Sequence, residues 1–383
     1  MSESEWRITL SLPYLIINQD KSRYYFPNTQ EKCCKYDEYN IFSYLCTVKV
    51  EYMMNLRKLY YLSHNGKNSN LLYFLKAYVR EYTPRCFTRM MLDRELAKLD
   101  KRTDRDYILQ RVDYYNKLTS SHAFDHKQWS QEAVEISRQP MTRQKVYYFD
   151  AMEIARYFSG KKRWILLSGD ITHVPDVPTI IKSRPLGDNN QNSVVLKMEK
   201  VRHFLFVNDK KAWRDKKNMT IFRGDLGARK QNRDVFMERF ADGQSPMVDA
   251  ASTNRIEAHP EWQAGKMTID EHLDYKFIMS LEGNDVASNL KWVMSSNSIA
   301  VTPRHTVETW FMEGTLIPNY HYIEVKDDFS DLEERLTYYI EHPEEAEAII
   351  QHAHEYVDQF RDEAREKLIS LLVLKKYFDI TND

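Results

Sequence analysis

The sequence predicts an α/β protein in which short, buried parallel strands alternate with helices. Three observations lead to this prediction. Short apolar runs end in polar turns, and segments with a helical spacing of apolar residues follow them. The length of 383 residues also exceeds what a single hydrophobic core ordinarily serves. We therefore expect two domains with a cleft between them, and ligands at the carboxyl ends of the strands.

The composition is typical of a globular protein and excludes several classes. The chain has 55 lysines and arginines against 56 aspartates and glutamates, mixed along its length, so nothing indicates nucleic-acid binding. Four cysteines without a CxxC pair predict neither a disulfide scaffold nor a zinc site. No apolar run reaches the roughly 18 residues of a membrane span, and no signal-peptide pattern opens the chain. We expect a cytoplasmic protein.

The first domain is expected to cover residues 1–210 and to be rich in helices up to residue 140. Gly66 is the only glycine in that helix-rich part. Apolar spacing predicts helices at 41–63, 70–82 and 104–118. Further on, we expect a strand at 144–149, a helix at 152–158 and a strand at 164–167.

The second domain is expected at residues 211–365, followed by a helix at 366–383 that packs back on the first domain. Strands are predicted at 219–222, 245–248, 277–281, 298–301 and 322–325. Helices are predicted at 232–240, from 286 onward, at 330–341 and at 343–360. The third of these helices would open with a capping box made by Ser330 and Glu333.

A strand, a glycine turn and a helix at residues 277–294 form the most informative segment. Glycine is scarce, at 10 in the chain, yet Gly283 stands at this junction. Asp285, Ser288 and Asn289 fall near the first helical turn, where an anion gains about 0.3–1 kcal/mol. The other interpretation is a well-capped helix without a ligand, and the dinucleotide pattern GxGxxG is absent.

Polar residues after the strand at 164–167 are candidates for chemistry. Asp170 would face the crevice as a general base, or it could simply cap a turn. His173 is a rival base or a surface histidine. Lys182 and Arg184 could hold a phosphate or an acidic acceptor, or they could lie in an exposed basic loop.

A second group of candidates lies in the later half of the chain. Arg223, Gly224 and Asp225 end a predicted strand, and Arg233 follows at the start of the next helix, where it could contact a phosphate or be solvated. Glu308 could hold ribose hydroxyls. His352 and His354 are two residues apart on a helix, so they point to different faces and make a poor metal pair.

These motifs, taken in order, resemble family-90 glycosyltransferases. The likeness covers roughly residues 145–365. It is carried by Gly169-Asp170, by Phe222-Arg223-Gly224, by the run from Glu282 to Trp292 and by the run from Glu308 to Tyr322. Members of the family include protein O-glucosyltransferases, capsule xylosyltransferases and bacterial lipopolysaccharide glycosyltransferases. The run 281–298 is most similar to the bacterial branch.

The resemblance implies a GT-B fold, with two Rossmann-like domains facing across a cleft and the nucleotide sugar held mainly by the second. It implies inverting transfer without a metal or other cofactor. Asp170 would be the catalytic base, and Arg233 would neutralise the donor diphosphate. Asp225 replaces a serine of the eukaryotic members, and Asn289 stands where they have an arginine.

The expected function is transfer of a sugar from a UDP-sugar to a glycan or glycolipid, such as lipopolysaccharide core or capsule. The protein would be cytoplasmic, with at most peripheral association at the inner membrane. A non-catalytic nucleotide-sugar-binding scaffold or regulatory protein is one alternative. A phosphotransferase is another, but the chain lacks the glycine-rich loop with Lys-Ser/Thr that such enzymes use. The donor-binding candidates are Arg223, Gly224, Asp225, Arg233, Gly283, Asp285, Ser288, Asn289, Lys291 and Glu308.

Overall fold

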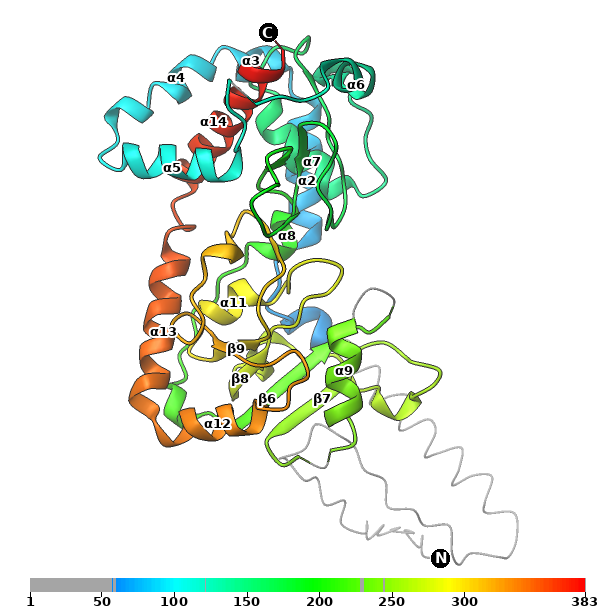
Figure 1. The fold of residues 1–383 in the computed structure, drawn as a ribbon, viewed down its shortest axis with the longest axis vertical. Coiled ribbons are helices and arrows are strands. Elements are labelled where there is room, and N and C mark those ends of the chain that lie inside the picture. Colours follow the sequence, from blue (N-terminus) through cyan, green and yellow to red (C-terminus); the bar gives the residue numbers. More distant parts are fainter. Residues whose placement is uncertain (1–56, 58–59, 121, 228–230, 244, 383) are drawn as a thin grey trace, which may run out of the picture. The chain divides into compact units, whose positions relative to one another are not determined.

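A computed structural model describes residues 57, 60–120, 122–227, 231–243 and 245–382 (Figure 1). The chain divides into two compact units, Met1–Lys58 and Leu59–Asp383. Every described residue except Arg57 belongs to the second unit, and all elements named below lie in it. The predicted helix at 41–63 lies mostly outside the described residues.

A five-stranded parallel sheet forms the centre of the second half of the chain. Its spatial order is β11–β9–β8–β6–β7. The strands are β6 (Lys217–Gly224), β7 (Val248–Ser252), β8 (Tyr275–Met279), β9 (Ile299–Thr302) and β11 (Ile323–Glu324). Counted along the chain, this is the doubly wound order 2-1-3-4-5, in which the connections reverse direction between β6 and β8. The carboxyl edge at that reversal is where such sheets bind ligands.

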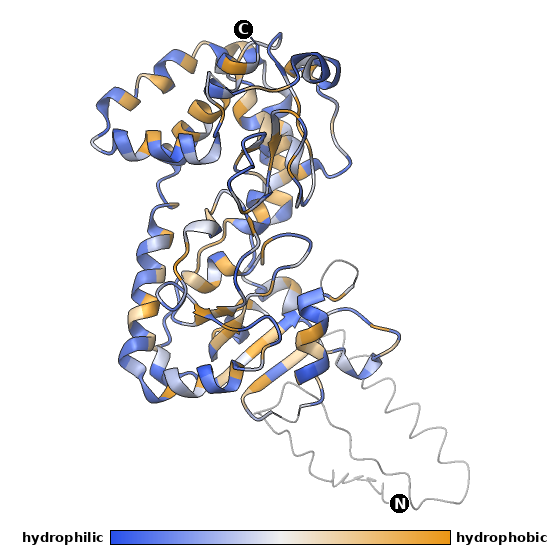
Figure 2. Cartoon of the chain, in the orientation of Figure 1, coloured by the Kyte–Doolittle hydropathy of each residue, from blue (hydrophilic) through white to orange (hydrophobic). Residues whose placement is uncertain are grey.

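Helices cover both faces of this sheet, which is why its strands read as continuous apolar runs. Figure 2 shows the apolar character concentrated on these strands. The helices are α9 (Gln231–Phe240), α10 (Ile269–His272), α11 (Leu290–Met294), α12 (Leu332–Glu341) and α13 (Pro343–Asp358). Helix α9 packs on β7, α12 on β6, and α11 and α13 on β9. Phe236, Phe277 and Val301 are buried in the resulting core.

The part before residue 210 consists mainly of helices. They are α2 (Asn70–Tyr82), α3 (Arg85–Arg89), α4 (Leu92–Leu96), α5 (Arg105–Tyr115), α6 (His126–Glu132), α7 (Lys145–Ala155) and α8 (Lys200–His203). Single 3-10 turns are η1 (Leu99–Lys101), η2 (Ile136–Arg138), η3 (Trp213–Asp215), η4 (Pro260–Trp262) and η5 (Glu313–Thr315). The helices predicted at 70–82 and 104–118 are therefore confirmed as α2 and α5.

Strand pairs in the same part are short. β1 (Val134–Glu135) pairs antiparallel with β2 (Arg163–Trp164), and β3 (Thr179–Ile181) pairs parallel with β5 (Ser193–Val195). β4 (Arg184–Pro185) pairs antiparallel with β10 (Val307–Glu308) of the later half. The mixed α/β class is confirmed, whereas the GT-B arrangement of two Rossmann-like domains stays a prediction.

Helix α14 (Glu363–Thr381) packs against α4, α5 and α7. It begins at a cap in which the Asp362 side chain accepts a hydrogen bond from the backbone N–H of Arg365. Its apolar residues, such as Leu371 and Tyr377, are buried in the same core as Phe149 of α7. This last helix therefore completes a core that the early helices begin.

The predicted strand at 144–149 is wrong, because these residues belong to helix α7. Tyr147, Tyr148, Phe149, Ala151 and Met152 are all buried, so the helix is apolar on most of its surface. A continuous apolar run looks the same in a buried strand and in a buried helix, and periodicity cannot separate the two.

Three other boundaries differ from the prediction. The helix expected from residue 286 begins only at Leu290, because the turn before it holds a hydrogen bond from the N–H of Gly283 to the carbonyl of Asp285. The capping box does not form: Asp331 precedes α12, while the Glu333 carboxylate accepts a hydrogen bond from Ser245. Strand β7 starts at Val248 rather than at 245.

Across the described part of the chain, none of the helices combines the length and the apolar character that crossing a bilayer requires.

Candidate active site

The guanidinium of Arg233 lies at the point where the sheet reverses, between the carboxyl ends of β6 and β8. It donates hydrogen bonds to the carbonyl and carboxylate of Asp225, at 2.9 and 3.0 Å. It also donates to the carbonyls of Leu281 and Glu282, at 2.9 and 3.1 Å. A cation is thus held at the edge where doubly wound sheets bind ligands.

The two motif glycines lie beside this guanidinium. A Cβ atom at Gly283 would lie 2.9 Å from Nη2 of Arg233, closer than side chains tolerate. A Cβ atom at Gly224 would lie 3.4 Å from Nη1 of Arg233 and 2.6 Å from the ring of Phe222. A side chain at Gly283 would therefore displace the guanidinium, and one at Gly224 would collide with the Phe222 ring, so these two glycines, far apart in the sequence, pack closely at one site.

A second arginine, Arg202 of α8, approaches the same place. Burial lowers the pKa of Arg233, the charge of Asp225 opposes that shift, and the charge of Arg202 adds to it. Arg202 is exposed, and its Nε lies 3.1 Å from Oε1 of Glu199. Since the charge of Arg202 acts on Arg233, an anion bound near Arg233 would be attracted by both guanidinium groups.

Lys182 connects the predicted base to the turn after β8. Its Nζ lies 2.7 Å from Oδ1 of Asp170 and 3.0 Å from Oε2 of Glu199. It also lies 2.7 Å from Oδ2 of Asp285. The Lys182 side chain is only 2% exposed. The Tyr147 hydroxyl donates a further hydrogen bond to Asp170 at 2.8 Å. The structure thus brings Asp170 and Asp285 together around one ammonium group.

Three carboxylates around one ammonium leave an excess of buried negative charge. As a result, the pKa values of the two aspartates shift in opposite directions. Burial alone would raise the pKa of Asp170, but Lys182 and the hydrogen bond from Tyr147 outweigh it and hold that pKa below its usual value. Burial raises the pKa of Asp285, and the charge of Asp170 adds to the effect. Burial and Lys182 lower the pKa of the neighbouring His203 to about 3, so this imidazole is neutral near pH 7. The lowered pKa keeps Asp170 ionised near pH 7.

The backbone before Asp170 depends on a glycine. Gly169 has φ of +120°, a conformation that side-chain-bearing residues rarely adopt. This turn directs the chain from the strand at 163–164 toward Lys182.

Arg184 and Glu308 form a buried ion pair across β4 and β10. Nε of Arg184 lies 2.7 Å from Oε1 of Glu308, and the Tyr114 hydroxyl donates to the other carboxylate oxygen. Burial of Arg184 and of Lys182 contradicts the alternative of an exposed basic loop. Glu308 uses both carboxylate oxygens inside the protein.

Other predicted donor-site residues are also engaged in internal contacts. Nζ of Lys291 lies 2.6 Å from Oε1 of Glu313, and neither side chain is exposed. Nη2 of Arg223 lies 2.8 Å from Oδ1 of Asp249. The Asn289 amide donates to the carbonyl of Met279 at 3.0 Å. Asp285 and Ser288 precede α11, which begins at Leu290 with Asn289 at its N-cap, and the anion site expected near its first turn stays a prediction.

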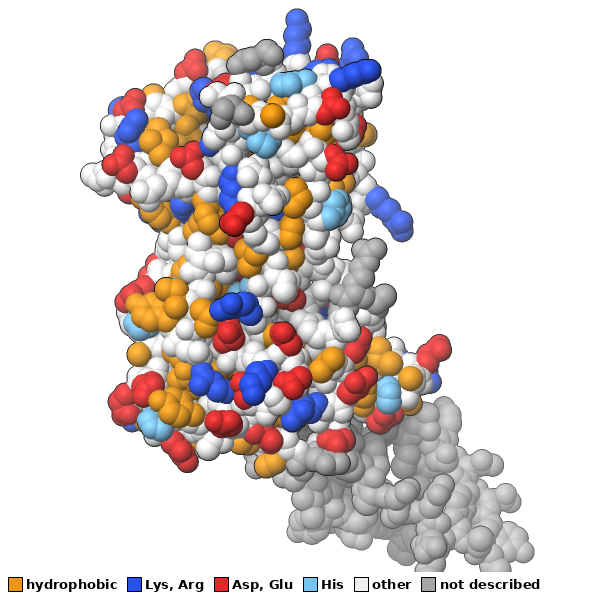
Figure 3. Space-filling view, viewed as in Figure 1, with side chains coloured by type: hydrophobic (Ala, Val, Ile, Leu, Met, Phe, Trp, Pro, Cys, Tyr) orange, Lys and Arg blue, Asp and Glu red, His pale blue; other side chains and the backbone are white. Residues whose placement is uncertain are grey.

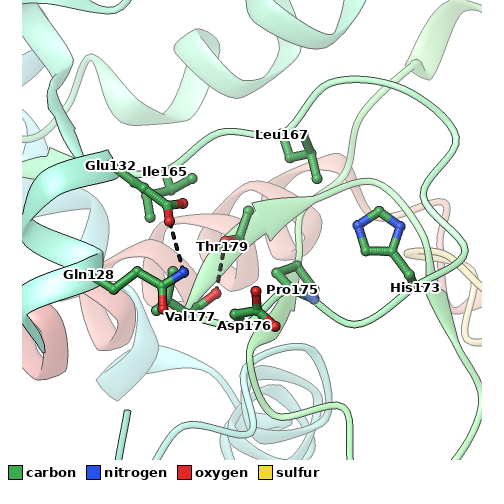
Figure 4. A pocket seen from close by; sticks show the side chains of 9 residues that line it. All are labelled: Gln128, Glu132, Ile165, Leu167, His173, Pro175, Asp176, Val177 and Thr179. Atoms are coloured by element: carbon green, nitrogen blue, oxygen red, sulfur yellow. Dashed lines mark hydrogen bonds between the residues drawn. The ribbon is translucent and has the colours of Figure 1, made fainter. Parts of the chain in front are cut away.

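His173 lines a separate pocket of about 220 Å³ (Figure 4). Its wall includes Gln128 and Glu132 of α6, whose side chains share a 3.0 Å hydrogen bond, and Thr179 of β3. None of the donor-site candidates lines this pocket, and neither does Asp170.

Sequence reasoning missed several residues of the site. Tyr147 was hidden because its helix read as a strand. Glu199 has a φ of 57°, a strained backbone conformation that cannot be read from the sequence. The helical spacing of Arg202 and His203 after Glu199 is visible in the sequence. His305, in the loop after β9, is 6% exposed, and neither ring nitrogen has a hydrogen-bond partner among the described residues. Burial lowers its pKa to about 4.

Within the described residues, no group of three or more histidine, cysteine, aspartate or glutamate side chains is placed to hold a metal ion. The carboxylates of Asp170, Glu199 and Asp285 converge on the ammonium of Lys182.

Comparisons with known proteins agree on one family. Residues 191–372 match the model of Glycosyl transferase family 90, a segment that begins after Asp170. The O-glucosyltransferase LpsA of Dichelobacter nodosus is 38% identical over 273 residues, which is 71% of this chain and 83% of that protein. An O-glucosyltransferase rumi homolog of Anopheles gambiae is 25% identical over 158 residues, which is 38% of this chain and 37% of that protein.

Proposed function

We propose that this chain, which belongs to glycosyltransferase family 90, moves a sugar from a UDP-sugar to a hydroxyl group of a surface glycan, with inversion at the anomeric carbon. Family membership makes the protein a sugar-transferring enzyme and sets aside the non-catalytic scaffold. The donor, the stereochemistry and the acceptor are our proposal.

One observation carries it: Asp170 and Asp285 share the ammonium of Lys182, at 2.7 Å each. Asp285 belongs to the turn after β8, the strand that borders the reversal of the sheet. A carboxylate that is held ionised therefore lies beside the edge where a nucleotide sugar would bind. This is the arrangement that an inverting transfer needs.

In the proposed step, Asp170 accepts the proton of the acceptor hydroxyl while the acceptor oxygen attacks the anomeric carbon. The bond from that carbon to the diphosphate oxygen breaks on the opposite side, and UDP leaves. The lowered pKa of Asp170 keeps the group ionised but makes it a weak base. Proton transfer in concert with bond formation fits such a base better than prior deprotonation does.

We propose that Arg233, with Arg202 as a second cation, stabilises the negative charge that the leaving diphosphate gains. Preorganised cations and donors lower the barrier because they need no rearrangement during the reaction. We propose that the transfer uses no metal, and that the two halves of the chain act as the two domains of a GT-B enzyme. His305 lies after β9 at the same edge of the sheet, with Nδ1 3.9 Å from Oε1 of Glu282 and no hydrogen bond to either ring nitrogen among the described residues, and is a further candidate donor contact.

The names of the relatives support glucose as the transferred sugar, and the acceptor is our proposal. The bacterial relative is named an O-glucosyltransferase, so UDP-glucose is the first donor to test. We propose lipopolysaccharide core or capsule as the acceptor, at the cytoplasmic face of the inner membrane. The pocket lined by His173 is a candidate subsite for the acceptor sugar, because His173 follows Asp170 by only three residues in the sequence.

The test combines a donor screen with one substitution. UDP-, GDP- and CMP-sugars are compared for thermal stabilisation, and a UDP-sugar is expected to give the largest shift. Asp170→Asn is expected to reduce transfer by about 10²–10⁴-fold while UDP affinity stays within about twofold. Asp215→Asn, on the exposed surface, serves as the matched control. Transfer near the wild-type rate in Asp170→Asn would remove this residue from the role of base.

A further inference from the structure

Helix α2 presents its most apolar face to the outside. Leu71, Leu75, Val79 and Tyr82 are 78%, 59%, 63% and 82% exposed. They recur at helical spacing, so they form one continuous stripe along the helix. Leu72 is exposed beside them.

The inward face of α2 combines apolar and polar contacts. Ala77 is buried, and the rings of Phe74 and Tyr78 pack against Phe149 of α7. Helix α2 packs on α7 (Figure 1), where the Tyr73 hydroxyl donates to Asp150 at 2.9 Å and Arg80 pairs with Glu153. The Tyr148 hydroxyl donates to Glu81. A surface helix ordinarily buries its apolar stripe and exposes its polar side. Helix α2 is apolar on both sides, and its outward stripe is left uncovered by the described residues, which indicates an apolar partner for that face.

Exposed apolar residues also follow α2 in the chain, and this segment is rich in positive charge. Phe87 of α3 and Met90 after it are also exposed. Between residues 67 and 105 the chain has ten lysines and arginines against five aspartates and glutamates, whereas the whole chain has a net charge of −1. Lys76, Arg89 and Arg94 are exposed among them. The face around α12, by contrast, shows interspersed acidic and basic side chains (Figure 3).

We propose that the outward face of α2, with Phe87 and Met90, docks on an anionic lipid surface. Leucines and aromatics enter the boundary between headgroups and acyl chains, and lysines and arginines contact the negative headgroups. A second copy of this chain is a poorer partner, because a twofold interface would bring the same positive segment against itself. The inference goes beyond the proposed transfer reaction and does not depend on it.

The experiment measures binding of the full chain to vesicles, without donor or acceptor. Wild-type protein is expected to co-sediment with phosphatidylglycerol-containing vesicles far better than with phosphatidylcholine vesicles, and less well as salt rises. A triple variant with Leu71→Ser, Leu75→Ser and Val79→Ser is expected to bind at least about tenfold more weakly. Ile317→Ser, an exposed apolar residue outside α2, is the matched control.

A charge variant keeps the proposal testable if the triple variant fails to fold. Lys76→Glu, Arg89→Glu and Arg94→Glu together are expected to reduce binding and its dependence on salt. Unchanged binding in the variants, no binding of the wild type, or a wild-type dimer that the triple variant loses would each overturn the proposal. Transfer to a soluble acceptor is measured in parallel, so a failure of the proposed reaction is distinguished from a failure of membrane docking.

Discussion

The clearest prediction concerns Lys182, whose ammonium is the only counter-charge within 3.0 Å that Asp170 and Asp285 share in the described structure. Lys182→Met keeps the length of the side chain and removes the charge. Breaking a buried ion pair by removing one partner costs about 3–5 kcal/mol of unfolding free energy. Because the lysine is 2% exposed and Asp285 is equally buried, we expect a loss in that range near pH 7.5.

The dependence of stability on pH provides a second, independent test of this prediction. In the wild type the pKa of Asp170 is depressed, so its contribution to stability is present above its unfolded pKa and is lost as the pH falls through the folded value. In the variant, carboxylates without a counter-charge have raised pKa values, so the variant is relatively more stable at low pH. The deficit of Lys182→Met should therefore shrink between pH 7.5 and about pH 5.

Urea denaturation, followed by tryptophan fluorescence at both pH values, measures the deficit. Lys375→Met provides the control, because Lys375 pairs with Asp379 on the exposed surface of α14. An exposed pair of this kind contributes less than about 1 kcal/mol. A loss in Lys182→Met no larger than in the control, or a deficit that grows on acidification, would refute the reasoning.

Three further predictions concern the donor site. Arg233→Ala should weaken UDP binding by about tenfold or more in calorimetry, and equal affinity in Arg233→Ala and in the surface variant Arg214→Ala would contradict its role. Gly283→Ala should displace the guanidinium of Arg233 and weaken UDP binding with little loss of stability. Gly265→Ala, where an added Cβ meets nothing within 4 Å, is the control and should leave UDP affinity unchanged. Equal UDP affinity in Gly283→Ala and Gly265→Ala would count against the packing argument. EDTA should leave transfer intact, and strict dependence on added manganese would show that a metal takes part.

The sheet of the second half could be predicted because its strands are simple. β8 and β9 are buried along their whole length, so each appears as an apolar run ended by polar or turn-forming residues. Helix α2 matched its prediction because Ser69 accepts a hydrogen bond from the N–H of Leu72 and marks the start. Where one periodicity of apolar residues dominated and capping or turn residues marked the ends of an element, the sequence was sufficient to predict that element.

The site could be predicted only in part. Asp170 and Gly283 follow strands, and Arg233 lies in the first turn of α9, so their positions in the sequence made them candidates. The contact between Lys182 and three carboxylates depends on tertiary folding, and the sequence around Lys182 equally permitted an exposed loop. The buried pairs of Lys291 with Glu313 and of Arg184 with Glu308 were hidden for the same reason, since a charged residue in a sequence does not reveal its partner.

Helix α14 has a consequence for how the chain folds during synthesis. Its apolar residues fill the core around α5 and α7, more than 200 residues earlier in the sequence, and Arg111 of α5 pairs with Glu366 of α14. Ribosomes add roughly 5–20 residues per second, and domains usually fold as they emerge. Here the early helices cannot close their core until α14 leaves the ribosome. The first half of the protein is therefore the last to finish, and nascent chains stalled before residue 363 should remain sensitive to protease there.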